Sequence, residues 1–282
     1  MLFILPWMGV SLAGTTDTKS GVTAEPRATG EEVSFILATV NGALSCPIDE
    51  RDVQSAWAGL RPLASDPTKA NTESISRDHV CVVEGTGMVS IMGGKWTTFR
   101  RMAEDAVDAA VHAGGLQPTR ESCTKHVKLH GSCGWSRTLH ITLARELDRR
   151  LPAARTGGPA ADAELIDVPA TAARLAAAYG GRAADVLDVG ERTDTLRPLV
   201  RGHPVLEAEV VYAARHEYCM TAADFLARRS RLAFTHVDAA KRAVPRVIEL
   251  LRREHGWSKW RAWRERRAAV RYLTQQFERR AG

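Results

Sequence analysis

Short apolar runs separated by turn residues begin the chain and predict strands. The first run, residues 1–13, is interrupted at 7–9 by a tryptophan, a methionine and a glycine, which predicts a β-hairpin. Residues 78–83 and 88–92 form a second apolar pair, joined by a glycine-containing turn. Runs this short and this close in sequence pair most simply as antiparallel strands. The pattern therefore predicts two hairpins in the first part of the chain.

Helical periodicity dominates the rest of the chain. Apolar residues recur every three or four positions over 31–44 and again from Thr97 to about Gly114. Beyond about Leu116 the composition becomes rich in alanine and arginine, and helical spacing is almost continuous. We therefore predict an α+β fold with an antiparallel-sheet domain over 1–118 and an all-helical domain over 119–282. The helices predicted in the second domain are 139–151, 170–179, 183–189, 207–218, 221–229, 237–255 and 258–279.

Composition excludes several classes of protein. The 282 residues are 44% hydrophobic and carry a net charge of +6, which is typical of a globular protein with a mild preference for acidic partners. No apolar run approaches the roughly 20 residues of a membrane-spanning helix. Five scattered cysteines do not indicate a disulfide framework. Cys123, His126, His130 and Cys133 match no zinc module, so we expect no metal site, and the charge alone, without a recognised module, indicates no nucleic-acid binding.

A Gly-Gly turn between a predicted strand and a predicted helix is the first candidate site. Gly93 and Gly94 follow the strand 88–92, and Lys95 stands at the start of the helix. The first N–H groups of a helix have no intrahelical acceptor and lie at the positive end of its dipole, so such a turn favours an anion or an electron-rich ring edge. The alternative is a tight turn with a solvated lysine.

Three basic residues follow predicted strands and form the second candidate site. Arg61 follows the predicted strand 53–60, Arg77 precedes the second hairpin, and Lys95 follows its second strand. A phosphate dianion requires several charged donors, which arginine supplies as a planar fork and lysine as a point charge. If the strand ends meet at one edge of a sheet, the three side chains converge. The alternative for each is a surface ion pair.

The segment Gly93-Gly-Lys-Trp-Thr-Thr-Phe-Arg100, followed by Met-Ala-Glu, resembles the flavin-side turn of the FAD-dependent glycerol-3-phosphate dehydrogenases, particularly the mitochondrial, quinone-reducing type. The resemblance extends, in the same order, over nearly the whole chain. The Gly-x-Gly-x-x-Gly motif with which this family begins does not occur here. We therefore expect the C-terminal portion of such an enzyme, without its N-terminal dinucleotide-binding half. The other matching segments are 3–7 with 13–17, 56–63, 74–79 and 207–234.

The resemblance implies a cofactor, a substrate and their residues. It implies an FAD-dependent oxidation of glycerol 3-phosphate to dihydroxyacetone phosphate, with electrons passed to a quinone. No residue matches the family's catalytic base, so no catalytic residue is assigned. For Trp96, the alternative to flavin contact is packing against the protein. For the Thr15 hydroxyl, the alternative to substrate contact is a hydrogen bond to the backbone. The implied flavin-binding residues are Gly93, Gly94, Lys95, Trp96 and Thr97, and the implied substrate-binding residues are Arg61, Arg77, Lys95 and Thr15.

The same resemblance implies a location and partners. A quinone-reducing enzyme of this type works at the mitochondrial inner membrane, and this portion would need the missing N-terminal half of the enzyme as its partner. The alternative is a truncated, non-catalytic chain that does not retain FAD and binds at most a partner or a membrane surface.

The last predicted helix, 258–279, is strongly basic. Its apolar residues recur at spacings of three, four and seven, which predicts one apolar face. A basic helix with tryptophan on its apolar face can lie in the headgroup region of an anionic membrane, so peripheral membrane contact is one interpretation. Packing of that face on the preceding helix is the other. The predicted face comprises Trp260, Trp263, Val270, Leu273 and Phe277.

Overall fold

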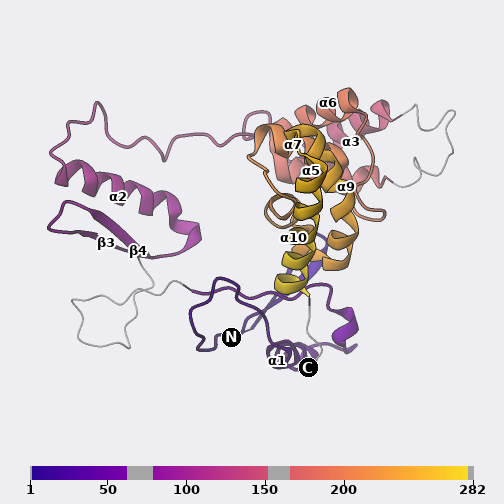
Figure 1. The fold of residues 1–282 in the computed structure, drawn as a ribbon, viewed down its shortest axis with the longest axis horizontal. Coiled ribbons are helices and arrows are strands. Elements are labelled where there is room, and N and C mark those ends of the chain that lie inside the picture. The colour runs from indigo at the N-terminus through magenta and orange to yellow at the C-terminus, as the bar shows by residue number, and fades with distance from the viewer. Residues whose placement is uncertain (1, 62–78, 152–165, 279–282) are drawn as a thin grey trace. The chain divides into compact units, whose positions relative to one another are not determined.

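A computed structural model describes residues 2–61, 79–151 and 166–278. The described chain combines small antiparallel sheets with many helices, so the predicted α+β class is confirmed (Figure 1). Among the described helices, none has both the length and the apolar composition required to cross a bilayer.

The chain divides into two compact units. One comprises Met1–Gly59 together with His130–Gly282, and the other comprises Leu60–Leu129. The first unit thus contains both the N-terminal hairpin and the helices of the second half of the chain. The domain boundary between 118 and 119 stays a prediction.

The N-terminal hairpin forms as predicted. Strand β1, Phe3–Trp7, pairs antiparallel with β2, Val10–Gly14. The turn residues Met8 and Gly9 have φ values of 51° and 84°. Two successive residues with positive φ are what a two-residue hairpin turn requires, because its twist then matches that of the strands.

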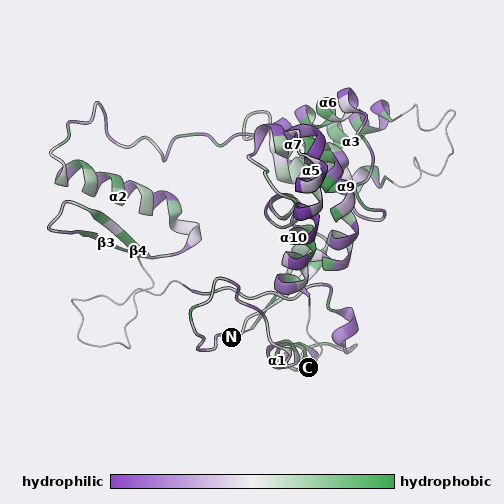
Figure 2. Ribbon diagram, viewed as in Figure 1, coloured by the Kyte–Doolittle hydropathy of each residue, from purple (hydrophilic) through white to green (hydrophobic). Residues whose placement is uncertain are grey.

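The second hairpin and the helix after it form the unit Leu60–Leu129. Strand β3, His79–Val83, pairs antiparallel with β4, Val89–Gly93, and α2, Phe99–Ala113, packs against both strands. A short 3-10 helix, η2 (Trp96–Thr98), joins β4 to α2. Figure 2 shows hydrophobic colour on the strands and alternating stretches along α2. No described residue in this unit is buried, so little apolar burial stabilises it.

The helices of the first unit surround a continuous apolar core. Fully buried leucines from four different helices meet there: Leu147, Leu175, Leu187 and Leu251. Every helix predicted beyond residue 119 lies within a few residues of an observed one, although 221–229 contains a π-helix. The helices of this unit are α1 (Gly30–Asn41), η1 (Glu50–Asp52), α3 (Leu139–Arg150), α5 (Val168–Tyr179), η4 (Gly180–Arg182), α6 (Ala183–Thr193), α7 (Glu207–His216), η5 (Asp224–Arg229), α8 (Leu232–Thr235), α9 (Val237–His255) and α10 (Lys259–Phe277).

The segment predicted as a strand over 53–60 is extended but pairs with no described strand, so this prediction is wrong. Its backbone is bonded to helix ends instead. The Ala56 N–H donates to the Phe277 carbonyl oxygen at 3.0 Å, and the Val237 N–H donates to the Gln54 carbonyl oxygen at 3.2 Å. Helix ends leave backbone groups unpaired, and an extended segment can satisfy them as a neighbouring strand would.

Helix α10 does not have the single apolar face that was predicted. Leu273 and Phe277 are buried, and α10 packs along α9. Trp260, Trp263 and Val270 are exposed and lie on a different side of the helix. The spacing is helical, as predicted, but the apolar residues divide between two faces.

Candidate functional site

Two glycines with positive φ form the turn between β4 and α2. Gly93 has a φ of 72° and Gly94 a φ of 79°. A Cβ atom on Gly94 would lie 2.7 Å from the Met102 sulfur and 3.1 Å from the His79 Cβ. Position 94 therefore requires glycine for its backbone conformation and again for the close approach of its neighbours.

A hydrogen bond anchors α2 to the first strand of the hairpin beside this turn. The His79 Nε2 atom lies 2.8 Å from an Asp105 carboxylate oxygen, and Arg101 lies 2.9 Å from the other oxygen of the same carboxylate. His79 is also the register partner of Gly93. Because His79 lies opposite Gly93 in the hairpin, its contact with Asp105 ties the start of the turn to α2. This contact limits the movement of the turn.

The outer side of the turn carries a positive charge and an exposed ring. Lys95 is exposed, and its ammonium makes no ion pair with any residue in the described part of the chain. The Trp96 ring stacks on Phe99 at 6.0 Å yet remains 89% exposed. The N–H groups of Trp96 and Thr97 begin the helical turn and have no carbonyl behind them. The turn can therefore bind an anion or a carbonyl edge.

Thr98 stabilises the turn and was not identified from the sequence. Its hydroxyl donates to the Lys95 carbonyl oxygen at 2.9 Å, and its N–H donates to the same oxygen at 2.9 Å. Met102 and Asp105 were also missed as supporting residues. The helical phase of α2 relative to the turn is the signal that would have indicated them.

The structure gives less support to the predicted convergence of basic residues. Arg61 is exposed and follows an extended segment that pairs with no described strand, so the assumption that it ends a strand is wrong. Arg77 lies outside the described residues. Lys95 follows β4 after one residue, as predicted. The meeting of these three side chains stays a prediction.

Thr15 lies in the other compact unit, directly after β2. Its exposed hydroxyl donates to the Thr16 carbonyl oxygen at 2.8 Å, which is the backbone alternative considered for it. The hydroxyls of Thr16 and Thr18 each donate to Glu32 at 2.9 Å. The Thr29 N–H, together with these hydroxyls, lowers the pKa of Glu32, because hydrogen bonds to a carboxylate favour its charged form.

The chain is similar to known proteins along nearly its whole length. Residues 122–262 match the family described as the C-terminal domain of alpha-glycerophosphate oxidase. The chain is 46% identical over 273 residues to the mitochondrial glycerol-3-phosphate dehydrogenase of Arabidopsis thaliana, with 97% of this chain and 43% of that protein covered. It is 40% identical over 282 residues to the mitochondrial glycerol-3-phosphate dehydrogenase of Rattus norvegicus, with 97% and 36% covered.

The fold is also similar to that of a solved structure. The glycerol-3-phosphate dehydrogenase from Bacillus halodurans, complexed with FAD, matches with a TM-score of 0.68 and 26% identity. The match covers 98% of this chain and 51% of the solved chain. The chain therefore spans about half, or less, of the length of these relatives.

Proposed function

Because the chain belongs to the FAD-dependent glycerol-3-phosphate dehydrogenase family, we propose that it forms the C-terminal part of an enzyme that oxidises sn-glycerol 3-phosphate to dihydroxyacetone phosphate. The observation that carries this proposal is 46% identity to the Arabidopsis thaliana enzyme over 97% of the chain. The similarity covers 97% of the chain and so extends well beyond residues 122–262, the part that matches the family model.

Gly93, Gly94, Lys95, Trp96 and Thr97 would hold the flavin ring. The positive-φ glycines bring the backbone close to a ligand, and the unpaired N–H groups that follow favour negative charge on its carbonyl edge. The exposed Lys95 adds a full positive charge to the same place. FAD, when bound, would supply the acceptor for the hydride from C2 of the substrate. The solved relative from Bacillus halodurans is complexed with FAD, which supports this assignment.

Arg61, Arg77 and Lys95 would bind the phosphate of the substrate, and Thr15 would contact its glycerol part. A guanidinium forms paired hydrogen bonds with phosphate oxygens, whereas the Lys95 ammonium contributes a point charge between the phosphate and the flavin side of the turn. With no acidic partner on Lys95 in the described residues, its charge is available to a ligand.

The whole enzyme would act at the mitochondrial inner membrane and pass its electrons to a quinone. The Arabidopsis thaliana and Rattus norvegicus relatives are both mitochondrial, which supports the compartment. The partner that completes the enzyme would be a polypeptide that supplies the dinucleotide-binding half with its Gly-x-Gly-x-x-Gly motif.

A chimeric enzyme tests this proposal. We would join the N-terminal half of the Arabidopsis thaliana enzyme to this chain and measure quinone reduction that depends on glycerol 3-phosphate. Lys95→Ala and Arg61→Ala should each remove about 1.5–3 kcal/mol of charged hydrogen bonding and raise KM by roughly 10- to 150-fold. Lys128→Ala, which removes an exposed lysine of the same unit, is the matched control. Unchanged kinetics in both Lys95→Ala and Arg61→Ala would refute the phosphate site.

A second candidate function is a non-catalytic chain that binds a partner but no FAD. It is favoured by one observation, the lack of any buried residue in the described part of Leu60–Leu129, because such a unit gains little from folding alone. A chimera that retains no flavin and oxidises no substrate would favour this candidate.

A further inference from the structure

Helix α10 carries most of the excess positive charge of the chain. Between Lys259 and Phe277 the sequence has six lysines and arginines and one acidic residue, Glu265, against a net charge of +6 for the whole protein. The stretch belongs to a well-packed part of the molecule. A charge this concentrated on one fixed helix indicates a surface with a function rather than general solubility.

The orientation of α10 is set by its buried side. Ala262, Ala269, Leu273 and Phe277 are buried, and the helix packs along α9. The Ala56 N–H adds a hydrogen bond to the last carbonyl of the helix at 3.0 Å. These contacts determine which residues of α10 point away from the core, so the exposed side is a permanent feature.

That exposed side combines large apolar groups with arginines. Trp260, Trp263 and Val270 are 64%, 54% and 40% exposed. We call this side the α10 face; it comprises Trp260, Trp263, Arg264, Arg267, Val270 and Arg271. Much of the apolar surface of Trp260, Trp263 and Val270 is therefore open to solvent within the described fold, on a helix that has a separate buried side.

Arginine side chains cover the tryptophan rings. The Arg264 guanidinium lies 4.9 Å from the Trp260 ring centre, and the Arg267 guanidinium lies 4.8 Å from the Trp263 ring centre. In each pair, an aromatic ring and a positive charge lie next to each other on the surface of α10. The boundary between lipid headgroups and acyl chains presents anionic phosphates and apolar groups at similarly close spacing.

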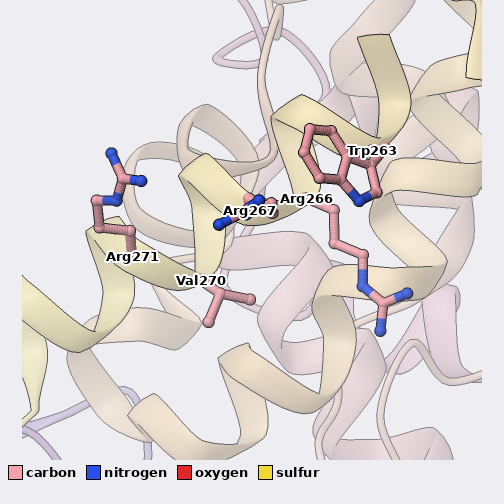
Figure 3. Close-up of a pocket in the computed structure, with 5 residues that line it drawn as sticks. All are labelled: Trp263, Arg266, Arg267, Val270 and Arg271. Carbon is pink, nitrogen blue, oxygen red and sulfur yellow. The ribbon is translucent and has the colours of Figure 1, made fainter. Parts of the chain in front are cut away.

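The arginines spread apart rather than converge. An open hollow of about 420 Å³ is lined by Trp263, Arg266, Arg267, Val270 and Arg271. Figure 3 shows the guanidinium groups of Arg266 and Arg271 directed to opposite sides of this hollow. A single small anion would be held by converging donors, whereas groups that spread apart can each contact a different phosphate of an extended surface.

Neither Arg266 nor Arg271 forms an ion pair with any residue in 2–61, 79–151 or 166–278. The same is true, within those ranges, of Arg264 and Arg267. Their charges are therefore not neutralised inside the described fold. Phosphates of an anionic surface would complement them.

We infer that the α10 face binds the surface of an anionic phospholipid bilayer. The exposed rings and Val270 enter the headgroup region while the arginines contact lipid phosphates. Nucleic acid is the less favoured ligand, because base stacking requires free ring faces and a guanidinium already lies over one face of each of Trp260 and Trp263. The inference deepens the proposed membrane location and rests on the proposed function for its biological role, but binding itself requires neither flavin nor substrate.

Vesicle co-sedimentation of the full chain tests the inference. We expect binding to phosphatidylcholine vesicles that contain phosphatidylglycerol, little binding to pure phosphatidylcholine, and weaker binding at high salt. Arg267→Glu/Arg271→Glu should lower the affinity at least about tenfold, because each basic residue near the surface contributes to the attraction. Arg137→Glu/Arg145→Glu, which makes the same change of net charge at exposed residues elsewhere in the unit, should keep most of it.

Trp260→Ala/Trp263→Ala tests the apolar part at unchanged charge. This variant should also bind roughly tenfold more weakly and should lose the blue shift of tryptophan emission that vesicles cause in the unmodified chain. Equal losses in Arg267→Glu/Arg271→Glu and in Arg137→Glu/Arg145→Glu would overturn the inference, since net charge alone would then explain binding. So would equal affinity for neutral vesicles, no affinity for anionic ones, or tighter binding to a short single-stranded oligonucleotide. Vesicle binding by a chimera that oxidises no substrate would separate this inference from the proposed function.

Discussion

At the scale of single residues, the turn at Gly94 depends on the lack of a side chain. Its φ of 79° lies in the region that other residues adopt only at a cost, and Met102 and His79 occupy the space beside it. Lys95, one position later, is exposed and makes no ion pair in the described part of the chain. Gly94 thus permits close packing, whereas the next residue, Lys95, presents a positive charge to solvent.

Gly94→Ala should destabilise the hairpin and α2 by about 1–2 kcal/mol, because alanine is strained at this φ. Hydrogen exchange of the β3 and β4 amides would measure the loss. Gly85→Ala is the control, since a Cβ atom there meets no neighbour within 4 Å and its φ is not in the left-handed region. Equal exchange rates in the two variants would show that the turn is not constrained as described.

Also at the scale of single residues, His203 makes the folding stability of the chain depend on pH. Partial burial, the nearby His236 ring at 5.1 Å and Arg242 all lower the pKa of His203. The unfolded chain therefore binds a proton at a higher pH than the folded one. The contribution of His203 to the free energy of unfolding is therefore fully present above the ordinary histidine pKa of about 6.5. This contribution is lost as the pH falls toward the lowered pKa.

His203→Gln should therefore reduce the loss of stability between neutral and mildly acidic pH. Urea unfolding at several pH values would measure the slope, and His140→Gln, at an exposed histidine of α3, is the control. An unchanged slope in His203→Gln would exclude His203 as its source.

At the scale of elements, an extended segment replaces a strand by bonding to helix ends. The Ser55 hydroxyl donates to the Ala233 carbonyl oxygen at 2.8 Å and accepts from the Val237 N–H at 2.9 Å. The Trp57 ring meets Phe234 edge-on at 5.0 Å. The segment thus contacts both α8 and the first residue of α9 and links the two helices.

Ser55→Ala should destabilise the first unit by about 1 kcal/mol, the usual contribution of a hydrogen bond to stability. Thermal unfolding followed by circular dichroism would measure the shift of Tm. Ser20→Ala is the control, because within the described residues that exposed hydroxyl bonds only the neighbouring carbonyl of Gly21. A Tm equal to that of Ser20→Ala would mean that Ser55 does not hold the segment.

At the scale of the whole molecule, burial is uneven between the two units. The helices enclose a core of fully buried side chains, whereas the described part of Leu60–Leu129 buries none. The turn proposed to hold the flavin belongs to this second unit. Its ring-binding geometry therefore lacks the support that a packed core provides.

We expect the purified chain to carry well below one FAD per molecule, because the motif for the ADP half is absent and the flavin turn lies in a unit without a core. Visible absorbance after gel filtration would measure it. The chimera with the N-terminal half of the Arabidopsis thaliana enzyme should retain about one flavin per chain. A stoichiometric flavin on the chain alone would contradict this expectation.

Local patterns in the sequence were enough to determine both hairpins, the Gly-Gly turn and nearly every helix, because the strand and helix periods and the turn glycines act over a few neighbouring residues. Tertiary structure alone decided where Gln54–Trp57 is bonded, which apolar residues of α10 are buried, and that Met102 and Asp105 support the turn. Each of these depends on contacts between elements far apart in the sequence or on the phase of one element against another. A periodic pattern gives the spacing of apolar residues along α10, but the position of α9 determines that Leu273 is buried and Trp263 exposed.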